Sequence, residues 1–431
     1  MAAPQKQYRV MVFGVGAFSQ GILRILKEAG ADVCTYLTRD YGHYGPMQEG
    51  KTYHKEYYPN PCEILRQEQI DFIVPMSIDW ALQDWTDEFL SLNVPILSPM
   101  GEAYQIERER DYSQRLCEQH GVTFAKSFVA RNKFEAEQVL RDHPMPYVIK
   151  NTFCSPTSPV HTIVSETIEQ TRYWLDDIDY KEGVFLQQYM GRKEVGHIVF
   201  ISAGQVHSIV TNQEYKRAFD GNQGIVAGAP LGGLVEWDPD DKYGISQALI
   251  QPLLPWFKST NFHGPLQVTG IWHDRQWQVL EYNIRLGVTC GPLILRMLKN
   301  PIQVLEQVVA NRPVSLELNG EHRFGASLTL AGYGYPYTQL TPPRLPIQLL
   351  EPFDCDVWWN EVDQDLKGRL ATSGYGANRI ADLTATGSSV EDALETVYRN
   401  IRKISCAGSY YRTDVGKTLW PPVYDGEWTT D

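Results

Sequence analysis

An acid, an amide and a guanidinium stand at alternate positions in the stretch LEYNIRLG, residues 280–287. They are Glu281, Asn283 and Arg285, and the residues between them are apolar or aromatic. In a β-strand alternate side chains share a face, so these three polar groups would form one row. Carboxylate and carboxamide oxygens suit a hard cation such as Mg²⁺, and a guanidinium beside them could neutralise a phosphoryl group. The same pattern also fits an ordinary solvated face of an edge strand.

Two other segments carry residues that could bind phosphate but also have a purely structural interpretation. Gly14, Gly16 and Gly21 follow a short β-branched run, with the spacing GxGxxxxG rather than GxGxxG. This turn predicts either a phosphate at a helix N-terminus or simply a tight turn that requires glycine. Asp32 is the one candidate for a ribose-binding acid, so a dehydrogenase has little support. Lys150 closes the strand-like PYVIK, where a solvated strand end is the simpler interpretation.

The first hundred residues alternate between strand-like and helix-like pieces. The strand candidates are residues 8–14, 32–38, 70–76 and 94–99, and the helix candidates are residues 15–30, 61–69 and 84–92. This β-α-β rhythm predicts a parallel sheet with helical crossovers.

The rest of the chain mixes strands and helices less regularly. Residues 105–121 predict a charged helix that ends at Gly121, and residues 244–259 predict another. Residues 212–234 are rich in glycine and predict a loop, whereas residues 265–287 predict a hairpin. The further strand candidates are residues 123–130, 146–151, 183–190 and 194–210, the last with a turn at Ala203-Gly204. Near the end, SSVEDALETVYRNIRKIS predicts an amphipathic helix behind a serine N-cap.

Composition limits the class of protein. A chain of 431 residues predicts about three domains, and 43% hydrophobic with 21% charged residues is typical of a globular protein. The net charge of −13 disfavours a nucleic-acid binder, which usually has a basic face. We expect no signal peptide and no membrane span, and the seven scattered cysteines suggest reduced thiols. We therefore expect a soluble cytoplasmic enzyme with no membrane or nucleic-acid partner.

Several segments resemble known motifs, in the same order along the chain. LEYNIRLG is similar to LEFNxRFG, EYKRAFDGNQG (residues 214–224) to DHKRAFDGDTG, and PYVIK to PVVIK. Residues 106–122 align with LEGSKAFAKxFLxxHGI, and residues 382–416 with VTALGxTLxEAxxxAYxxxxxIxFxGxxYRxDIG. These are motifs of glycinamide ribonucleotide synthetases (phosphoribosylamine–glycine ligases), a family of the ATP-grasp superfamily. The resemblance runs from the first strand to Gly416.

This resemblance implies a multidomain α/β and α+β protein with an ATP-grasp fold. Residues 1–104 would form a Rossmann-like domain, residues 105–325 the ATP-grasp domain with a lid at about 123–192, and residues 326–431 a C-terminal αβ domain. It implies a C–N ligase that uses ATP and Mg²⁺, with Mn²⁺ as a substitute. The partners would be a small carboxylate and a small amine, and the assembly would be a monomer or a homodimer.

The resemblance also assigns roles to single residues. Glu281 and Asn283 would hold Mg²⁺ on the ATP phosphates. The remaining nucleotide contacts would come from Arg110, Lys150, Gln188, Tyr189, Met190 and Glu194: two phosphate-contacting cations, an adenine-binding hinge and a ribose-binding acid. Arg285, Lys216 and Arg217 would lie near the reacting phosphate, and Gly14, Gly16, Ser19, Glu214 and Asp220 near the substrates.

Four departures from the family pattern concern the substrates and the lid. GxGGREHA is GVGAFSQG at residues 14–21, and the glycine-rich lid is NTFCSPTSPVHT at residues 151–162, with Ser155, Thr157 and Ser158 as its possible phosphate donors. GPNTGGMGA is IVAGAPLGG at residues 225–233, and DPE is VTC at residues 288–290. These changes favour a specialised ligase with a different carboxylate and amine. Glycine with phosphoribosylamine is the alternative, and a paralogue that binds nucleotide without turnover is the third interpretation.

The expected chemistry places no covalent nucleophile on the protein. The γ-phosphate of ATP would pass to a carboxylate, and an amine would then attack the acyl phosphate. Cys290 near the site is accordingly expected to pack rather than react. Phe18, Tyr44 and Trp80 are candidates for substrate contacts, although ordinary packing is the favoured interpretation for all three.

Overall fold

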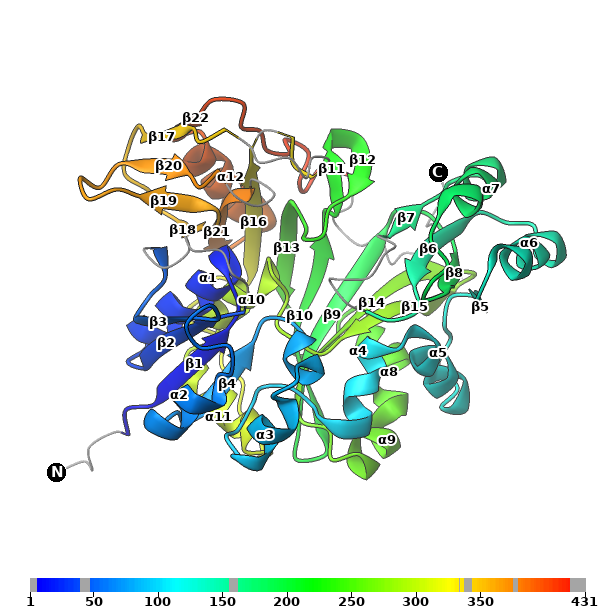
Figure 1. Ribbon diagram of the computed structural model, residues 1–431, viewed down its shortest axis with the longest axis horizontal. Helices are drawn as coiled ribbons and strands as arrows, with labels where there is room; N and C mark the ends of the chain where they lie inside the picture. Colours follow the sequence, from blue (N-terminus) through cyan, green and yellow to red (C-terminus); the bar gives the residue numbers. More distant parts are fainter. Residues whose placement is uncertain are drawn as a thin grey trace.

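The computed structural model describes residues 6–38, 47–154, 162–332, 334–336, 343–374 and 379–418 (Figure 1). Within them the chain begins with a parallel four-stranded sheet in the order β3-β2-β1-β4. Its elements are β1 (Arg9–Phe13), α1 (Gly16–Glu28), β2 (Asp32–Leu37), β3 (Lys51–His54), α2 (Cys62–Gln67), β4 (Phe72–Pro75) and α3 (Thr86–Ser91). The predicted parallel sheet is confirmed. Residues 94–99 form only an isolated bridge at Ile96 rather than a full strand, since their two prolines donate no ladder hydrogen bond.

The predicted helix 105–121 is two helices. α4 (Gln105–Arg108) and α5 (Arg110–Gln119) are separated by Glu109, whose φ of −119° and ψ of 111° are extended. Glu109 forms a β-bridge with Phe153, and the amide of Arg110 donates to the carbonyl of Thr152 at 3.1 Å. The helix therefore breaks because its backbone pairs with the chain that follows Lys150.

A small antiparallel sheet in the order β5-β8-β6-β7 lies in the segment that the sequence proposes as a lid, and we call it the lid sheet; two helices pack on it (Figure 1). The elements are β5 (Ser127–Ala130), α6 (Lys133–Asp142), β6 (Tyr147–Asn151), β7 (Ile163–Val164), α7 (Ile168–Asp177) and β8 (Val184–Gln188). Its core holds Tyr147, Ile149 and Leu186, all fully buried. Lys150 thus lies within β6 rather than at its last position.

An eight-stranded sheet in the order β15-β14-β9-β10-β13-β16-β21-β18 runs through the molecule (Figure 1). Its strands are β9 (Glu194–Ser202), β10 (Gln205–Glu214), β13 (Gly232–Trp237), β14 (Gly264–His273), β15 (Gln276–Asn283), β16 (Phe324–Ala331), β18 (Asp356–Trp359) and β21 (Arg379–Gly387). The turn at Ala203-Gly204 is where the sequence predicts it, with φ of 51° and 67°. The predicted hairpin at residues 265–287 is β14–β15.

The prediction of a loop at residues 212–234 is wrong. The stretch contains the end of β10, a separate two-stranded hairpin of β11 (Arg217–Phe219) and β12 (Gln223–Val226), and the start of β13. Two of its glycines serve close packing rather than flexibility. A Cβ on Gly232 would lie 2.6 Å from Val415, and one on Gly233 would lie 3.0 Å from Thr289.

The predicted helix at residues 244–259 is also interrupted. It consists of α8 (Ile245–Leu249), the 3₁₀ turn η5 (Gln251–Leu253) and α9 (Leu254–Ser259). Pro252 and Pro255 each lack an amide donor, which prevents one continuous hydrogen-bond ladder.

The C-terminal part of the chain continues the large sheet through β16, β21 and β18, and it also forms a smaller sheet of its own. This part includes α10 (Cys290–Met297), α11 (Pro301–Val309), α12 (Val390–Ile401) and a sheet in the order β19-β20-β17-β22, made of β17 (Pro346–Leu349), β19 (Val362–Gln364), β20 (Leu370–Thr372) and β22 (Ile404–Cys406). Ser389 caps α12 by accepting from the Asp392 amide, as the sequence predicts. Because β16 pairs with β13, the predicted boundary at 325/326 lies inside one continuous sheet.

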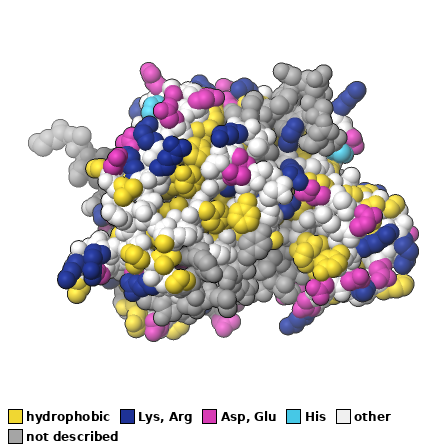
Figure 2. Space-filling model, turned by 90° about the horizontal axis from the view of Figure 1, so that it is seen from above, with side chains coloured by type: hydrophobic (Ala, Val, Ile, Leu, Met, Phe, Trp, Pro, Cys, Tyr) yellow, Lys and Arg dark blue, Asp and Glu magenta, His cyan; other side chains and the backbone are white. Residues whose placement is uncertain are grey.

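The face of the molecule seen in Figure 2 has no region of one dominant charge among its described residues. On the face drawn in Figure 2, acidic and basic side chains are interspersed rather than gathered by sign. Such a face lacks the basic stripe of a nucleic-acid-binding surface. Over the described residues, the structure contains no helix that is both long and apolar enough to span a membrane.

Candidate active site

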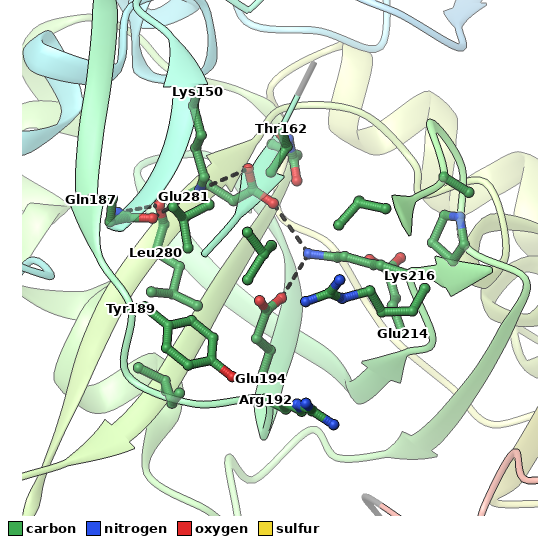
Figure 3. A pocket seen from close by; sticks show the side chains of 18 of the residues that line it. Lys150, Thr162, Gln187, Tyr189, Arg192, Glu194, Glu214, Lys216, Leu280 and Glu281 are labelled. Carbon is green, nitrogen blue, oxygen red and sulfur yellow. Dashed lines mark hydrogen bonds and ion pairs between the residues drawn. The ribbon is translucent and has the colours of Figure 1, made fainter. Parts of the chain in front are cut away.

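A pocket lies between the lid sheet and the large sheet (Figure 3). Most of the residues that the sequence proposes for nucleotide, metal and phosphate line it: Lys150, Gln188, Tyr189, Met190, Glu194, Glu214, Lys216, Arg217, Glu281, Asn283 and Arg285. They come from β6, β8, β9, β10, β11 and β15 and from the segments that directly follow β8, β10 and β15. The fold therefore gathers residues from positions 150 to 285 at one place.

The row Glu281, Asn283, Arg285 faces this pocket, although only part of it is strand. β15 ends at Asn283, so Arg285 lies just beyond the strand. The alternation continues because Tyr282, Ile284 and Leu286 are 2%, 0% and 0% exposed on the other side. Burial of these three apolar side chains fixes the polar row toward the pocket.

Three cations surround the Glu281 carboxylate. The nearest atoms lie at 3.3 Å for Lys216 Nζ, 3.4 Å for Arg110 Nη1 and 4.0 Å for Lys150 Nζ. Burial raises the pKa of Glu281, but Lys216, Lys150 and Arg110 outweigh it and hold that pKa well below its usual range. Glu281 is therefore ionised, and its negative charge offsets part of the positive charge of these three cations. The positive charge that remains can receive a further anion.

The two lysines differ in their electrostatic surroundings. Burial lowers the pKa of Lys150 to about 8, against the opposing effect of Glu281. Burial also lowers the pKa of Lys216, but Glu194 and Glu281 reverse this and raise it above its usual value. Lys216 Nζ donates to Glu194 Oε2 at 2.9 Å, so it joins the proposed ribose-binding acid to the proposed metal-binding acid (Figure 3).

Sequence reasoning missed Gln187, which orients Lys150. Gln187 Oε1 accepts from Lys150 Nζ at 2.8 Å, and Gln187 Nε2 donates to the carbonyl of Leu280 at 3.0 Å. Gln187 thereby ties β6 to β15 beside Glu281. Its only sequence signal is a polar residue in the otherwise apolar run VFLQQ, and this does not identify a partner 37 residues away.

Glu107 was missed as well, and it orients Arg285. Its side chain is buried, and it accepts from Arg285 Nε at 3.1 Å and from the Ile284 amide at 2.6 Å. The Glu107 charge is the largest of the effects that raise the pKa of Arg285. Arg217 is held similarly, by Glu166 at 3.3 Å and by the carbonyl of Gly224 at 2.7 Å.

One end of the pocket is less polar. Tyr189 and Met190 follow β8, and Val148, Val164, Ile271 and Leu280 line the pocket with them. The amides of Gln188 and Tyr189 donate to the carbonyls of Lys126 and Pro146, which fixes this hinge against the lid. An apolar slot bordered by backbone suits a planar heterocycle, while the cations suit its phosphates.

The sequence profile of the phosphoribosylglycinamide synthetase ATP-grasp (A) domain matches residues 108–289, the segment that carries this pocket. Residues 108–289 are an ATP-grasp domain of the phosphoribosylglycinamide synthetase family. The predicted family resemblance and the predicted ATP-grasp fold are confirmed.

Full-length relatives agree with this assignment. The chain is 26% identical over 338 residues to a phosphoribosylamine–glycine ligase of Streptomyces coelicolor, covering 76% of this chain and 79% of that protein. It is 23% identical over 428 residues to the Thermotoga maritima ligase of the same name, covering 95% and 99%.

Solved structures agree on the fold. The crystal structure of a Thermotoga maritima phosphoribosylamine–glycine ligase has a TM-score of 0.75 at 21% identity, covering 94% of this chain and 99% of that one. A biotin carboxylase from Campylobacter jejuni, solved as a β-γ-ATP complex, has a TM-score of 0.69 at 12% identity, covering 94% of this chain and 93% of that one.

Two of the predicted residues outside the lining of this pocket have structural roles. Arg110 touches it through Glu281, and its Nε donates to the carbonyl of Asn151 at 2.9 Å, which the break before α5 permits. Asp220 is not among the residues that line the pocket, and it accepts from the Thr413 amide in the C-terminal segment at 2.8 Å. Its prediction as a substrate residue gains no support from this position.

Gly14, Gly16 and Ser19 lie in the N-terminal domain, at the turn from β1 into α1. A Cβ on Gly14 would lie 2.5 Å from Ser19 Oγ, and Gly16 has a φ of 62°. The Ala17 amide, in the first turn of α1, already donates to Asn360 Oδ1 at 3.0 Å. The tight-turn interpretation of this glycine motif therefore accounts for what the structure shows.

The remaining candidate residues from the sequence either have structural roles or lie outside the described residues. Asp32 begins β2 and pairs with Arg9 at 2.6 Å. It therefore lies at the end of the parallel strands opposite the β1–α1 turn, which removes the remaining support for a dehydrogenase. Trp80 is buried against Phe89, with ring centroids 5.5 Å apart, so it packs. Cys290, the first residue of α10, is buried and accepts from Asn212, as expected for a packing residue. Tyr44 and the lid residues Ser155, Thr157 and Ser158 lie outside the described residues.

The donor set fits a divalent cation. Glu281 contributes carboxylate oxygens and Asn283 an amide oxygen from the same face, and hard cations such as Mg²⁺ take such ligands. Lys216 and Arg110 hold the two Glu281 oxygens at 3.3 and 3.4 Å. Both contacts to Glu281 are longer than the other hydrogen bonds of the same cations. Lys216 donates to Glu194 at 2.9 Å, and Arg110 donates to the carbonyl of Asn151 at 2.9 Å.

Proposed function

We propose that this chain is an ATP- and Mg²⁺-dependent carboxylate–amine ligase that forms an amide through an acyl phosphate and releases ADP and phosphate. One observation carries the proposal. In an ATP-grasp domain, a carboxylate–amide face at Glu281 and Asn283 shares one pocket with Lys150, Lys216 and Arg285. Such a pocket can hold a nucleoside triphosphate with its metal and still place a guanidinium beside the phosphate that is transferred.

We infer that glycine and phosphoribosylamine are the substrates. The sequence alone favours a specialised ligase, because the loops at residues 14–21 and 225–233 depart from the family pattern. The comparisons support the alternative better, since the curated relatives reported above are phosphoribosylamine–glycine ligases and one of them aligns over 95% of this chain. The differences from the family motifs at residues 14–21 and 225–233 would then be sequence variation among enzymes with the same activity.

The residues of the pocket would act by neutralisation and alignment. Mg²⁺ held by Glu281 and Asn283 would supply charge neutralisation at the triphosphate oxygens. Lys150 and Lys216 would bind the phosphates, and Arg285, held by Glu107, would stabilise charge on the phosphoryl group as it moves to the carboxylate. The amine then attacks the acyl carbon, and inorganic phosphate leaves. None of these steps needs a covalent intermediate on a serine or cysteine.

A specialised ligase remains the second candidate because of one local feature. The Ala17 amide is occupied by Asn360, and the Arg379 guanidinium lies 5.4 Å from the ring centroid of Phe18. The start of α1 is thus filled by this chain's own C-terminal residues, where the family motif GxGGREHA differs most. An amine other than phosphoribosylamine would be selected there.

The experiment is an ADP-release assay with mass spectrometry of the products. Purified protein with ATP and Mg²⁺ receives glycine plus phosphoribosylamine, and in parallel a panel of amino acids paired with small amines. Glycinamide ribonucleotide formation supports the first proposal. Turnover only with another pair supports the specialised ligase. ATP binding without ADP release in any mixture would contradict both and would favour a nucleotide-binding protein without turnover.

A further inference from the structure

The C-terminal segment at residues 410–416 packs on the β11–β12 hairpin, which carries Arg217 and directly follows Lys216 (Figure 1). This segment contains the motif YRTDVG, for which the proposed chemistry has no role. The hairpin forms a sheet of its own among the described strands, with only two strands. Isolated two-stranded hairpins are marginally stable, so its position depends on what it packs against.

Arg412 makes the central contact between the two. The residue is 1% exposed. Its Nη1 donates to the carbonyl of Arg217 at 3.1 Å, and its Nη2 donates to Asn222 Oδ1 at 2.9 Å. Its guanidinium also lies 4.9 Å from the ring centroid of Tyr215, the residue before Lys216. One buried side chain therefore contacts the first residue of the hairpin, its turn, and the residue two positions before it.

Asp414 completes this contact. It pairs with Arg412 Nε at 2.8 Å and with Nη2 at 2.7 Å, and its Oδ2 accepts from the Gly221 amide at 2.9 Å. Gly221 has a φ of 66°, so this bond holds the residue at which the hairpin turns. The pair leaves no uncompensated charge in the interior, which would otherwise destabilise the fold.

Three further contacts surround this pair. Asp220 Oδ1 accepts from the Thr413 amide at 2.8 Å, and the Gly416 amide donates to the Tyr215 hydroxyl at 2.7 Å. The rings of Phe219 and Tyr410 lie 5.5 Å apart between centroids. The segment thus contacts β11, the turn of the hairpin and the residue before Lys216.

We propose that Arg412 is a positioning residue for the catalytic cations Lys216 and Arg217. It acts through the backbone of Arg217 and the turn at Gly221, and it has no contact with the nucleotide. This inference rests on the proposed function of the pocket, since it assigns Lys216 and Arg217 to the transferred phosphate. A C-terminal element, distant in sequence from the ATP-grasp domain, thereby sets the geometry of its reaction centre.

The test compares R412M and R412K with the control R399A. Arg399 is an exposed arginine of the same C-terminal part, paired with Asp354. Turnover and nucleotide affinity are measured together, because a misplacement of about 1 Å can cost roughly 100-fold in rate. We expect kcat to fall about 100-fold in R412M and less in R412K, with the Kd for ATP changed less than about threefold. R399A should match the unaltered protein.

Hydrogen exchange of the peptide covering residues 217–226 gives a readout that needs no turnover. We expect bound nucleotide to protect this peptide in the unaltered protein and in R399A, and that protection to be lost in R412K. If the protein shows no ligase activity, the proposed function is refuted. The hydrogen-exchange measurement still decides in that case whether Arg412 holds the hairpin. Unchanged kcat, or equal losses of kcat and ATP affinity, would overturn the proposal. If R412M does not fold, D220N decides by the same two readouts, because it weakens the contact without removing a buried charge.

Discussion

The charge arrangement at Glu281 is the most informative feature at the scale of residues. The half-buried Glu281 carboxylate is matched by Lys216, Arg110 and Lys150, and Lys216 is shared with Glu194. The excess of cations is what a triphosphate would require. Of the two lysines, only Lys150 has a lowered pKa, since burial outweighs its attraction to Glu281.

Lys150 predicts a pH dependence of ATP binding. Its pKa of about 8 lies below the ordinary value of 10.5, so the folded protein loses this proton at a pH where the unfolded chain keeps it. Lys150 therefore adds stability as pH rises from about 8 to 10.5, but it loses the charge that binds phosphate. We expect ATP affinity to fall above pH 8, with uptake of up to about one proton on binding, measured by calorimetry in two buffers. K150R, whose guanidinium stays charged, should show a flat profile. A steep profile in K150R would contradict this assignment.

Glu281→Gln should abolish most of the metal-dependent turnover. The amide keeps the shape but loses the negative charge that would hold the metal, and we expect kcat to fall at least about 100-fold. Initial rates against Mg²⁺ concentration measure this, and thermal unfolding checks the fold. The control is Glu317→Gln, since Glu317 is exposed and pairs only with Lys299 among the described contacts. Normal rates in Glu281→Gln would mean that the metal lies elsewhere.

Glu107→Gln tests how Arg285 is oriented. The variant keeps an acceptor for the Ile284 amide but removes the charge that pairs with Arg285. We expect kcat to fall about tenfold or more while the Kd for ATP stays nearly constant, because Arg285 is assigned to the transferred phosphate. Rapid-quench measurement of the phosphoryl-transfer step separates this from product release. An effect on ATP affinity alone would place Arg285 at the nucleotide instead.

Most of the residues that touch the proposed nucleotide could be predicted, and those that orient them could not. Glu281, Asn283 and Lys150 stand in short motifs whose residue types already indicate their chemistry. Glu107 and Gln187 act through partners 178 and 37 residues away, and a charged helix or an apolar strand gives no sign of such a partner. Their roles follow only from tertiary packing.

At the scale of elements, the sequence predicts periodic segments well and broken ones poorly. α12 begins where its serine N-cap predicts, because capping and amphipathicity are both local. The interruption between α4 and α5 depends on the bridge from Glu109 to Phe153, and the strands hidden in residues 212–234 depend on Val415 and Thr289 packing on glycine. These are long-range causes that composition does not reveal.

Ser389→Ala should affect stability without affecting turnover. The Ser389 side chain accepts from the Asp392 amide at 3.1 Å, and loss of an N-cap costs about 1 kcal/mol. Urea unfolding should show this decrease in the free energy of unfolding, with unchanged kcat and KM. Ser388→Ala is the neighbouring control, since Ser388 is not the N-cap residue. Equal effects of both substitutions would argue against the cap as the cause.

At the scale of the whole molecule, the ATP-grasp and C-terminal parts share one sheet. β13 pairs with β16, and β16 pairs with β21, so the proposed domain boundary at 325/326 crosses a continuous hydrogen-bonded ladder. The C-terminal strands and α12 also close an apolar cluster around Leu328, Leu383 and Val397. We therefore expect the proposed ATP-grasp and C-terminal segments to fold together rather than as independent units.

Removal of residues 326–431 should prevent folding of the remainder. The truncation would leave β13 as an unpaired edge and expose the apolar side chains that the cluster covers. We expect the fragment to aggregate, as measured by its soluble yield and by size-exclusion chromatography beside the full chain. A monomeric fragment with a cooperative unfolding transition would show that the C-terminal part is separable.

The central claim is that ATP phosphorylates a carboxylate in this pocket, and transfer of an oxygen isotope tests it most directly. Glycine labelled with ¹⁸O in its carboxylate is supplied with phosphoribosylamine, ATP and Mg²⁺, and the released nucleotide and phosphate are examined by mass spectrometry. If an acyl phosphate forms, inorganic phosphate carries one ¹⁸O for each amide produced and ADP carries none. Label in AMP, or amide formation with unlabelled phosphate, would contradict the account.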